Sequence, residues 1–496
     1  PSGTVSLTGS SDFTFDSGSS VMLGGDSTLS KSGSVTWPSL DLNGNTLTLA
    51  SNITDMSVDG AMSIGTGESL SSGSSILNLN DNLTIVSGGT LTSGSGKVQI
   101  SEALTLGGEL VQGGGILNLI KGGTVGASGK LNMSGSELKL GSALSIPGTL
   151  VVDNGTSWSG WVGTLDLSAG TLESSGGTLS LNQFTTSANT SFKLSGNTEI
   201  TSSDNMTFGT LDLGGNKLTL GTGSKGLTLP NTLTMDNVSS VIETKNVNLT
   251  LGKALSLTSG SITSTGGTLS FANGLAVSGD GTMSVLDSNL SVSQSLNFLS
   301  ASFESSVLDL QGATTLTSNG PVSFKKVNLN SKVLTLGSAS TELKLTDANT
   351  ALSLSGIALE TGPGSLTLSG ALTMSGNSKL NSSGGTITLN SGGSASSGTE
   401  ISLPDTTLVL QNALSLAGAT LKTKNTTLTT NDKALSLSSS SILEVDGTQD
   451  LSGVSPDNST TLRLTANSTI DDNATLTVGT LDLANFALTL DDNMSR

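Results

Sequence analysis

The chain repeats one short pattern, a glycine pair followed by alternating apolar and polar residues. The pattern occurs at 114–119, 176–181, 266–271 and 384–389. Glycine adopts the backbone conformations of tight turns, and strict alternation places apolar side chains on one face of a strand. Each copy therefore predicts a turn that leads into a half-buried β-strand.

A second pattern places a corner between two short strands. The sequence Leu-Asp-Leu-Asn-Gly-Asn-Thr-Leu-Thr-Leu at 40–49 returns in related form at 211–220 and 481–490. The Gly and Asn residues at its centre tolerate the positive φ that tight corners need. The eight prolines fall outside the expected strand centres, where the backbone N–H that proline lacks is required.

The spacing of these patterns indicates the length of the repeat. Residues 76–79 match 116–119 after a shift of 40 residues, and the glycine pairs lie 62, 90 and 118 residues apart. Such intervals fit multiples of a coil of about 20 to 23 residues, which divides into three strand-and-turn units of about seven. The sequence therefore predicts an all-β fold, a right-handed parallel β-helix (β-solenoid). We expect about three strands per coil and roughly 20–24 coils in one continuous body over residues 1–496, without a separate catalytic or membrane domain.

Alternation also predicts which side chains face the interior. Leu, Val and Ile should point inward, and Thr, Ser, Asn or Asp outward. Outward Asn and Thr should stack on like residues of the next coil as polar ladders. A disordered chain rich in Ser, Gly, Asn and Thr is the alternative, but the regular Leu-x-Leu pairs disfavour it.

Composition excludes several classes of function. The chain has no Cys, His or Tyr, and its only arginines are Arg463 and Arg496, so a disulfide or a histidine metal site is impossible. A net charge of −18 disfavours nucleic acid as a partner. No apolar run approaches the roughly 20 residues that span a bilayer. Because the chain starts at Pro1 rather than Met, we expect it to be a processed or excised piece.

Candidate catalytic residues are scarce. The adjacent acidic pairs are Asp471-Asp472 and Asp491-Asp492. Neighbours in a strand point to opposite faces, so neither pair converges as the two carboxylates of a glycoside hydrolase must. General acids and bases of other kinds also lack candidates. We therefore expect no enzyme, no catalytic or metal-binding residues and no cofactor.

Two kinds of residue are candidates for surface interactions. Trp158 and Trp161 could stack on sugar rings, although covering a bulge of the solenoid is the favoured interpretation, as it is for Trp37. Many Asn-x-Ser/Thr sequons occur, as chance produces in such a composition. The candidate glycosylation sites among them are Asn82, Asn154, Asn205, Asn248 and Asn467.

The ends of the sequence suggest self-association. Neither 1–20 nor 481–490 shows a capping helix, and both read as ordinary strands. An uncapped coil offers unpaired backbone groups to another strand. Either the chain is a slice of a longer protein, or its ends pair with the next copy in a head-to-tail filament.

The repeated units at 176–181 and 211–220 resemble the β-helical stalk or filament regions of large microbial cell-surface proteins, namely autotransporter passengers and filamentous-haemagglutinin-like repeat adhesins. The resemblance covers nearly the whole chain and is one of repeat style. It implies an extracellular structural protein that forms a surface filament or stalk by stacking of coils. An adhesin segment that binds glycans or surfaces is the alternative, and a polysaccharide-degrading enzyme similar to a viral tailspike is a distant third.

Overall fold

The computed structural model describes residues 3–6, 15–16, 18–159, 162–299, 301–471 and 476–490. In these residues the structure contains β-strands and no helix, and the paired strands run parallel. They form a β-solenoid of about 22 coils, with about three parallel sheets per coil of about 21 residues. The predicted fold class and coil number are therefore confirmed.

The chain divides into two compact units, Pro1–Leu249 and Thr250–Arg496. Of the three twelve-stranded sheets in the described residues, one lies wholly within each unit, and strands from successive coils are neighbours in it. The long sheet of the first unit consists of β1 (Gly3–Ser6), β3 (Ser27–Ser30), β6 (Thr46–Leu49), β9 (Ser69–Gly73), β12 (Thr90–Ser93), β15 (Glu109–Gln112), β18 (Lys130–Asn132), β21 (Thr149–Val152), β24 (Thr171–Ser174), β27 (Ser191–Leu194), β30 (Thr210–Asp212) and β33 (Thr232–Thr234).

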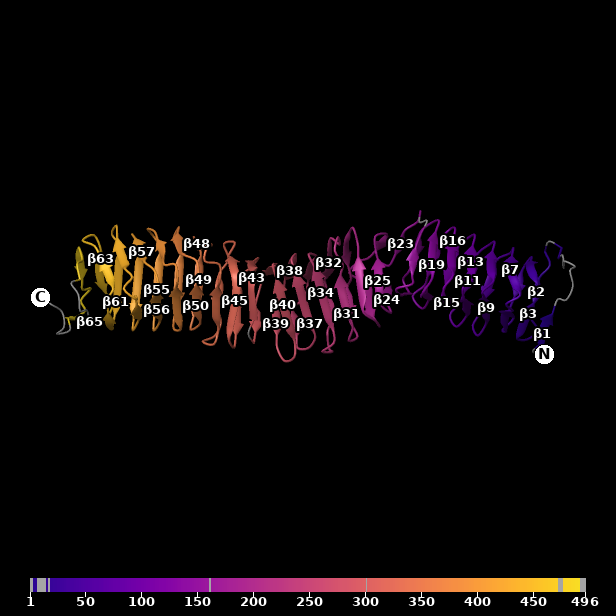
Figure 1. The fold of residues 1–496 in the computed structure, drawn as a ribbon, viewed down its shortest axis with the longest axis horizontal. Helices are drawn as coiled ribbons and strands as arrows, with labels where there is room; N and C mark the ends of the chain where they lie inside the picture. Colours follow the sequence, from indigo (N-terminus) through magenta and orange to yellow (C-terminus); the bar gives the residue numbers. More distant parts are fainter. Residues whose placement is uncertain are drawn as a thin grey trace. The chain divides into compact units, whose positions relative to one another are not determined.

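Two shorter sheets of seven strands complete the first coils of this unit, and Figure 1 shows several of their strands side by side. The first consists of β4 (Gly33–Trp37), β7 (Ile53–Val58), β10 (Ile76–Leu79), β13 (Lys97–Ile100), β16 (Ile116–Leu119), β19 (Glu137–Leu140) and β22 (Ser157–Trp158). The second consists of β8 (Met62–Ile64), β11 (Leu83–Ile85), β14 (Leu104–Leu106), β17 (Gly123–Val125), β20 (Leu144–Ser145), β23 (Leu165–Asp166) and β26 (Phe184–Thr185).

The second unit also contains a long sheet of twelve strands, whereas its shorter sheets differ from those of the first unit. Its long sheet consists of β36 (Leu255–Leu257), β39 (Leu275–Val277), β42 (Leu296–Phe298), β44 (Thr314–Ser318), β46 (Leu334–Leu336), β49 (Ala358–Gly362), β52 (Lys379–Ser382), β55 (Glu400–Pro404), β58 (Thr420–Lys424), β61 (Ile442–Asp446), β64 (Thr461–Leu464) and β66 (Thr480–Asp482).

The pairing register explains the repeat seen in the sequence. Leu77 pairs with Val98, and Val98 pairs with Leu117. The shift of 40 residues therefore spans two coils of slightly different length. All three side chains are fully buried, as the alternation predicts. Leucine dominates the interior of this thin core, and rings are buried at a few places, as in the tilted pair Phe303 and Phe324, whose centroids lie 5.1 Å apart.

The repeated corners have the predicted backbone. Asn43 and Gly44 have φ of 46° and 79°, and Ala484 and Asn485 have 47° and 70°. The Asn45 side chain donates to the Leu42 carbonyl at 3.0 Å, which fixes the corner from within.

The described prolines also avoid strand centres. Three of them lie in strands, and each occupies a strand end: Pro321 begins β45 (Pro321–Asn328), Pro404 ends β55, and Pro456 ends β63 (Val454–Pro456). Their missing N–H therefore removes no hydrogen bond from a strand centre.

The polar side chains follow the prediction in part. Outward threonines occupy the same place in successive coils, as Thr84, Thr105 and Thr124 do, but two features differ. Outward asparagines bond to unlike partners, such as Asn78 to Asp55 at 2.9 Å. Moreover, a set of Ser and Thr residues near the corners is buried. Thr190, for example, donates to the Leu167 carbonyl of the preceding coil at 2.7 Å. A corner leaves backbone groups outside the strand ladders, and a buried hydroxyl satisfies them.

Candidate functional site

Two surface features gather side chains that could have a function. One is a column of alternating charges on the long sheet of the second unit. The other is a hollow beside two aromatic rings in the first unit. Neither was predicted as such, although Trp158 belongs to the second.

The column of charges, here called the charge ladder, consists of Lys422, Glu444, Arg463 and Asp482. These residues are register partners on β58, β61, β64 and β66, so each occupies the same place in successive coils. Their strand neighbours Leu421, Leu443 and Leu462 are buried. Alternation therefore directs Lys422, Glu444 and Arg463 outward, and Asp482 continues the column by its register with Arg463.

The distances along the ladder fall in the range of ion pairs. Lys422 Nζ lies 3.7 Å from Glu444 Oε2, and Arg463 Nη1 lies 3.3 Å from Glu444 Oε1. Arg463 Nε lies 3.0 Å from Asp482 Oδ2. Each inner residue thus bridges the coils on both sides of it, which makes a network rather than isolated pairs.

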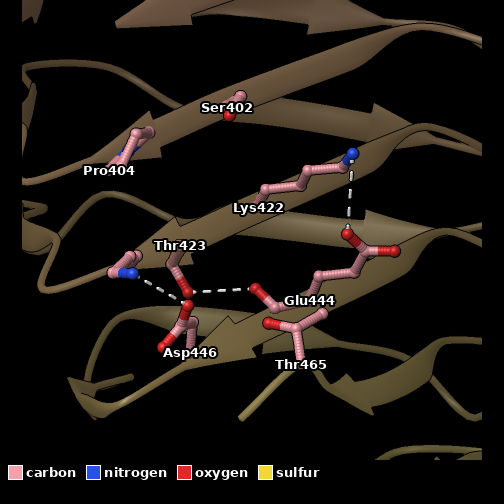
Figure 2. A pocket seen from close by; sticks show the side chains of 8 residues that line it. Ser402, Pro404, Lys422, Thr423, Glu444, Asp446 and Thr465 are labelled. Atoms are coloured by element: carbon pink, nitrogen blue, oxygen red, sulfur yellow. Dashed lines mark hydrogen bonds and ion pairs between the residues drawn. The ribbon is translucent and has the colours of Figure 1, made fainter. Parts of the chain in front are cut away.

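Beside the ladder lies a shallow hollow of about 230 Å³. Figure 2 shows Lys422 reaching toward Glu444, and Thr423 bonded to the Glu444 backbone, whose carbonyl accepts its hydroxyl at 3.2 Å. A second ion pair, Lys424 with Asp446 at 3.3 Å, closes the other side. Acidic and basic groups balance within the hollow.

Hydrogen bonds hold the cations of the ladder in their charged form. The bond to Glu400 raises the pKa of Lys422, and the bond to Asp482 raises the pKa of Arg463. A cation with a raised pKa does not release a proton near neutral pH, so it is a poor general acid. In the described part of the chain, no group of three or more acidic residues is placed to hold a metal ion. The ladder is suited to holding coils together.

The second feature, here called the aromatic hollow, has a volume of about 230 Å³. Trp158 at the end of β22 and Phe184 at the start of β26 stand nearly perpendicular, at 73°, with ring centroids 5.2 Å apart. Both rings are half-buried and make further contacts. Ser180, Asn182 and Gln183 complete the lining and are exposed.

The hollow forms where the sheet arrangement of the first unit changes. β22 and β26 are the last strands of the two seven-stranded sheets, whereas β25 (Gly177–Ser180) and β28 (Thr198–Thr201) belong to a different sheet. At this point Gly177 has a φ of 93° and lies against Asn154, whose side chain a Cβ would overlap. Trp158 and Phe184 meet at this change from one sheet to another.

The tryptophans have different surroundings. Trp158 lines the aromatic hollow, and Trp161 lies outside the described residues. Trp37 is buried at the end of β4, with 5 % of its surface exposed. Of the acidic pairs, Asp471 ends β65 (Ser468–Asp471), and the other three aspartates lie outside the described residues.

The candidate glycosylation sites are all exposed in the structure. Three of these asparagines accept a backbone N–H from the next coil: Asn82 from Ala103 at 3.1 Å, Asn154 from Thr178 at 3.4 Å and Asn467 from Ala487 at 2.9 Å. Asn205 and Asn248 begin the strands β29 (Asn205–Thr207) and β35 (Asn248–Leu251). The side chains of Asn82, Asn154 and Asn467 therefore have a structural use, and the glycosylation of all five asparagines stays a prediction.

Sequence reasoning missed the charge ladder and the role of Phe184. A signal for the ladder was present, because its charges alternate in sign at the coil period. Phe184 had no such signal, since it meets Trp158 from a different sheet.

Comparison with protein-family models, curated proteins and solved structures found no match to this chain. The described residues contain no helix long and apolar enough to cross a membrane. The structure thus defines the class of protein: it is a parallel β-solenoid.

Proposed function

We propose that the chain is a structural segment of an extracellular, cell-surface stalk or filament, in which stacked coils set a distance. The observation that carries this proposal is the regular register of the long sheets, each of which follows twelve strands through successive coils. Each further coil adds about 4.8 Å and repeats the same backbone hydrogen bonds. Such a body gains length without a larger core.

The charge ladder supports the same role. Its ion pairs connect four consecutive strands of the long sheet in the second unit. Connections of this kind resist sliding between neighbouring coils, because a one-residue slip would turn every charged side chain toward the core. Resistance to deformation is what a spacer needs.

Removal of whole coils tests the spacer role. Asp55 and Glu137 occupy the same place in the first seven-stranded sheet, four coils apart. Deletion of 55–136 should leave a folded protein that is shorter by about 19 Å in electron microscopy. The matched control, deletion of 55–125, ends within a coil and should misfold because it breaks the register. An unchanged length, or equal damage by both deletions, would contradict the proposal.

Head-to-tail association of copies belongs to the same proposal. A parallel coil presents unpaired backbone donors and acceptors, which a strand of a second copy satisfies as well as a strand of the same chain. Electron microscopy and analytical ultracentrifugation of the purified chain should then show filaments that lengthen with concentration. Discrete monomers at every concentration would contradict it.

A further inference from the structure

The aromatic hollow has features that a spacer does not require. Many outward columns carry small or charged side chains, such as Thr84 and Thr105, which are register partners, and the exposed apolar side chains elsewhere, such as Leu286, are mostly aliphatic. Here two large rings remain partly exposed and stand beside exposed amides. Exposed aromatic surface next to polar groups is typical of binding sites rather than of folding.

We propose that the aromatic hollow binds one ring of a neutral saccharide. A pyranose ring presents C–H bonds on its faces and hydroxyl groups around its edge. The electron-rich face of an aromatic ring attracts such C–H bonds. Trp158 and Phe184 meet edge to face, with centroids 5.2 Å apart, so one ring covers part of the other's face and the saccharide ring stacks beside this contact.

The polar lining matches the edge of such a ring. The Asn182 amide is anchored, because its Oδ1 accepts the Ser203 backbone N–H at 2.8 Å, and its NH₂ is a hydrogen-bond donor. Gln183 supplies a donor and an acceptor, and Ser180 supplies a hydroxyl. All three are neutral, and the described residues that line the hollow include no charged side chain. Neutral sugar hydroxyls fit this lining better than carboxylate or sulfate groups.

The size of the hollow limits the ligand. Its volume of about 230 Å³ lies below the roughly 300–1,000 Å³ of pockets that enclose a drug-sized molecule. One ring therefore enters, and the rest of a glycan chain remains outside. The inference is independent of the spacer role, since a stalk can carry such a site or lack it.

The test uses the full chain on an array of immobilised neutral oligosaccharides that end in glucose, galactose, mannose or N-acetylglucosamine. We expect at least one of these rings to retain the protein. Titration with the corresponding soluble oligosaccharide should then change the tryptophan fluorescence. Trp158→Ala should weaken binding about tenfold. Gln183→Ala should weaken it about threefold.

Two variants separate loss of binding from loss of fold. Gln183 is exposed, so its replacement leaves the packing intact even if Trp158→Ala disturbs it. Trp37→Phe alters a buried tryptophan far along the sequence and should leave binding unchanged. The proposal would be overturned if the array retained the protein on no neutral saccharide, or on charged saccharides alone. It would also be overturned if folded Gln183→Ala and Trp158→Ala variants both bound as well as the native protein.

Discussion

Gly115 shows how closely successive coils approach at their corners. A Cβ at this position would overlap the Gly96 carbonyl oxygen and the Gln112 Nε2 atom. Gln112 is buried, and its Nε2 donates to Gly96 at 2.8 Å, so it has little room to move. We predict that Gly115→Ala lowers the free energy of unfolding by about 1–3 kcal/mol. Urea denaturation measures the change.

Gly24→Ala is the matched control for this prediction. A Cβ at Gly24 meets no atom within 4 Å, and its φ is not in the left-handed region. The same substitution should therefore be neutral or slightly stabilising there, because alanine restricts the unfolded chain. If Gly115→Ala changed the free energy of unfolding as little as Gly24→Ala does, the corner at Gly115 would have room for a methyl group.

The buried hydroxyls make a second prediction at the residue scale. Thr190 Oγ1 donates to the Leu167 carbonyl and accepts the Ser187 N–H at 2.9 Å. Thr190→Val keeps the shape and removes both bonds, so the free energy of unfolding should fall by about 1–3 kcal/mol. Thr84→Val, on the outward face of β11, should change it little. Thermal unfolding of both variants checks this, and a stable Thr190→Val would deny the hydroxyls a structural role.

At the scale of elements, the charge ladder should depend on the order of its charges. Glu444→Lys puts a positive charge between Lys422 and Arg463, so that three cations follow one another in consecutive coils. We predict a loss of roughly 1 kcal/mol at low salt, which shrinks in 1 M NaCl as the repulsion is screened. Glu444→Gln removes the same carboxylate without adding a positive charge, so it should lose less than Glu444→Lys. A loss independent of salt would point to packing instead of charge.

A separate ion pair in the first unit predicts a pH dependence. The hydrogen bond from Lys217, with Nζ 2.6 Å from the carboxylate, lowers the pKa of Glu243 below its ordinary value of 4.5. A lowered carboxyl pKa stabilises the fold above the ordinary value, and this contribution is lost as the pH falls through the folded-state pKa. Glu243→Gln should therefore be less stable than the native protein at pH 7, with a smaller difference at pH 3. Urea titrations at both pH values, with exposed Glu102→Gln as the control, test this.

Local rules predicted the strands well and the side-chain chemistry less well. Alternation and glycine pairs locate strands because both act within a few residues. The inward direction of Thr190 was also accessible, since it lies two residues before buried Phe192 and so shares its face. The meeting of Trp158 with Phe184 was not, because it depends on where two sheets end, which no local pattern encodes.

At the scale of the whole molecule, the topology makes each coil depend on its immediate neighbours. In both units the strand partners lie about one coil away in the sequence, as Leu117 does from Val98 and from Leu138. Nearest-neighbour contacts of this kind make stability a sum over coils and interfaces. A local defect should therefore spread only a short way along the stack.

Leu117→Asp tests this. Leu117 is fully buried on β16, and an unpaired carboxylate there should disrupt its coil. Hydrogen exchange should show lost protection in β16 and in its neighbours β13 and β19, while β53 (Thr386–Leu389) of the second unit keeps its protection. Leu117→Met, which keeps an apolar side chain of similar volume, should leave the exchange pattern unchanged. Simultaneous loss of protection in both units would mean that the chain unfolds as a single cooperative body, and stability would then not be additive over coils.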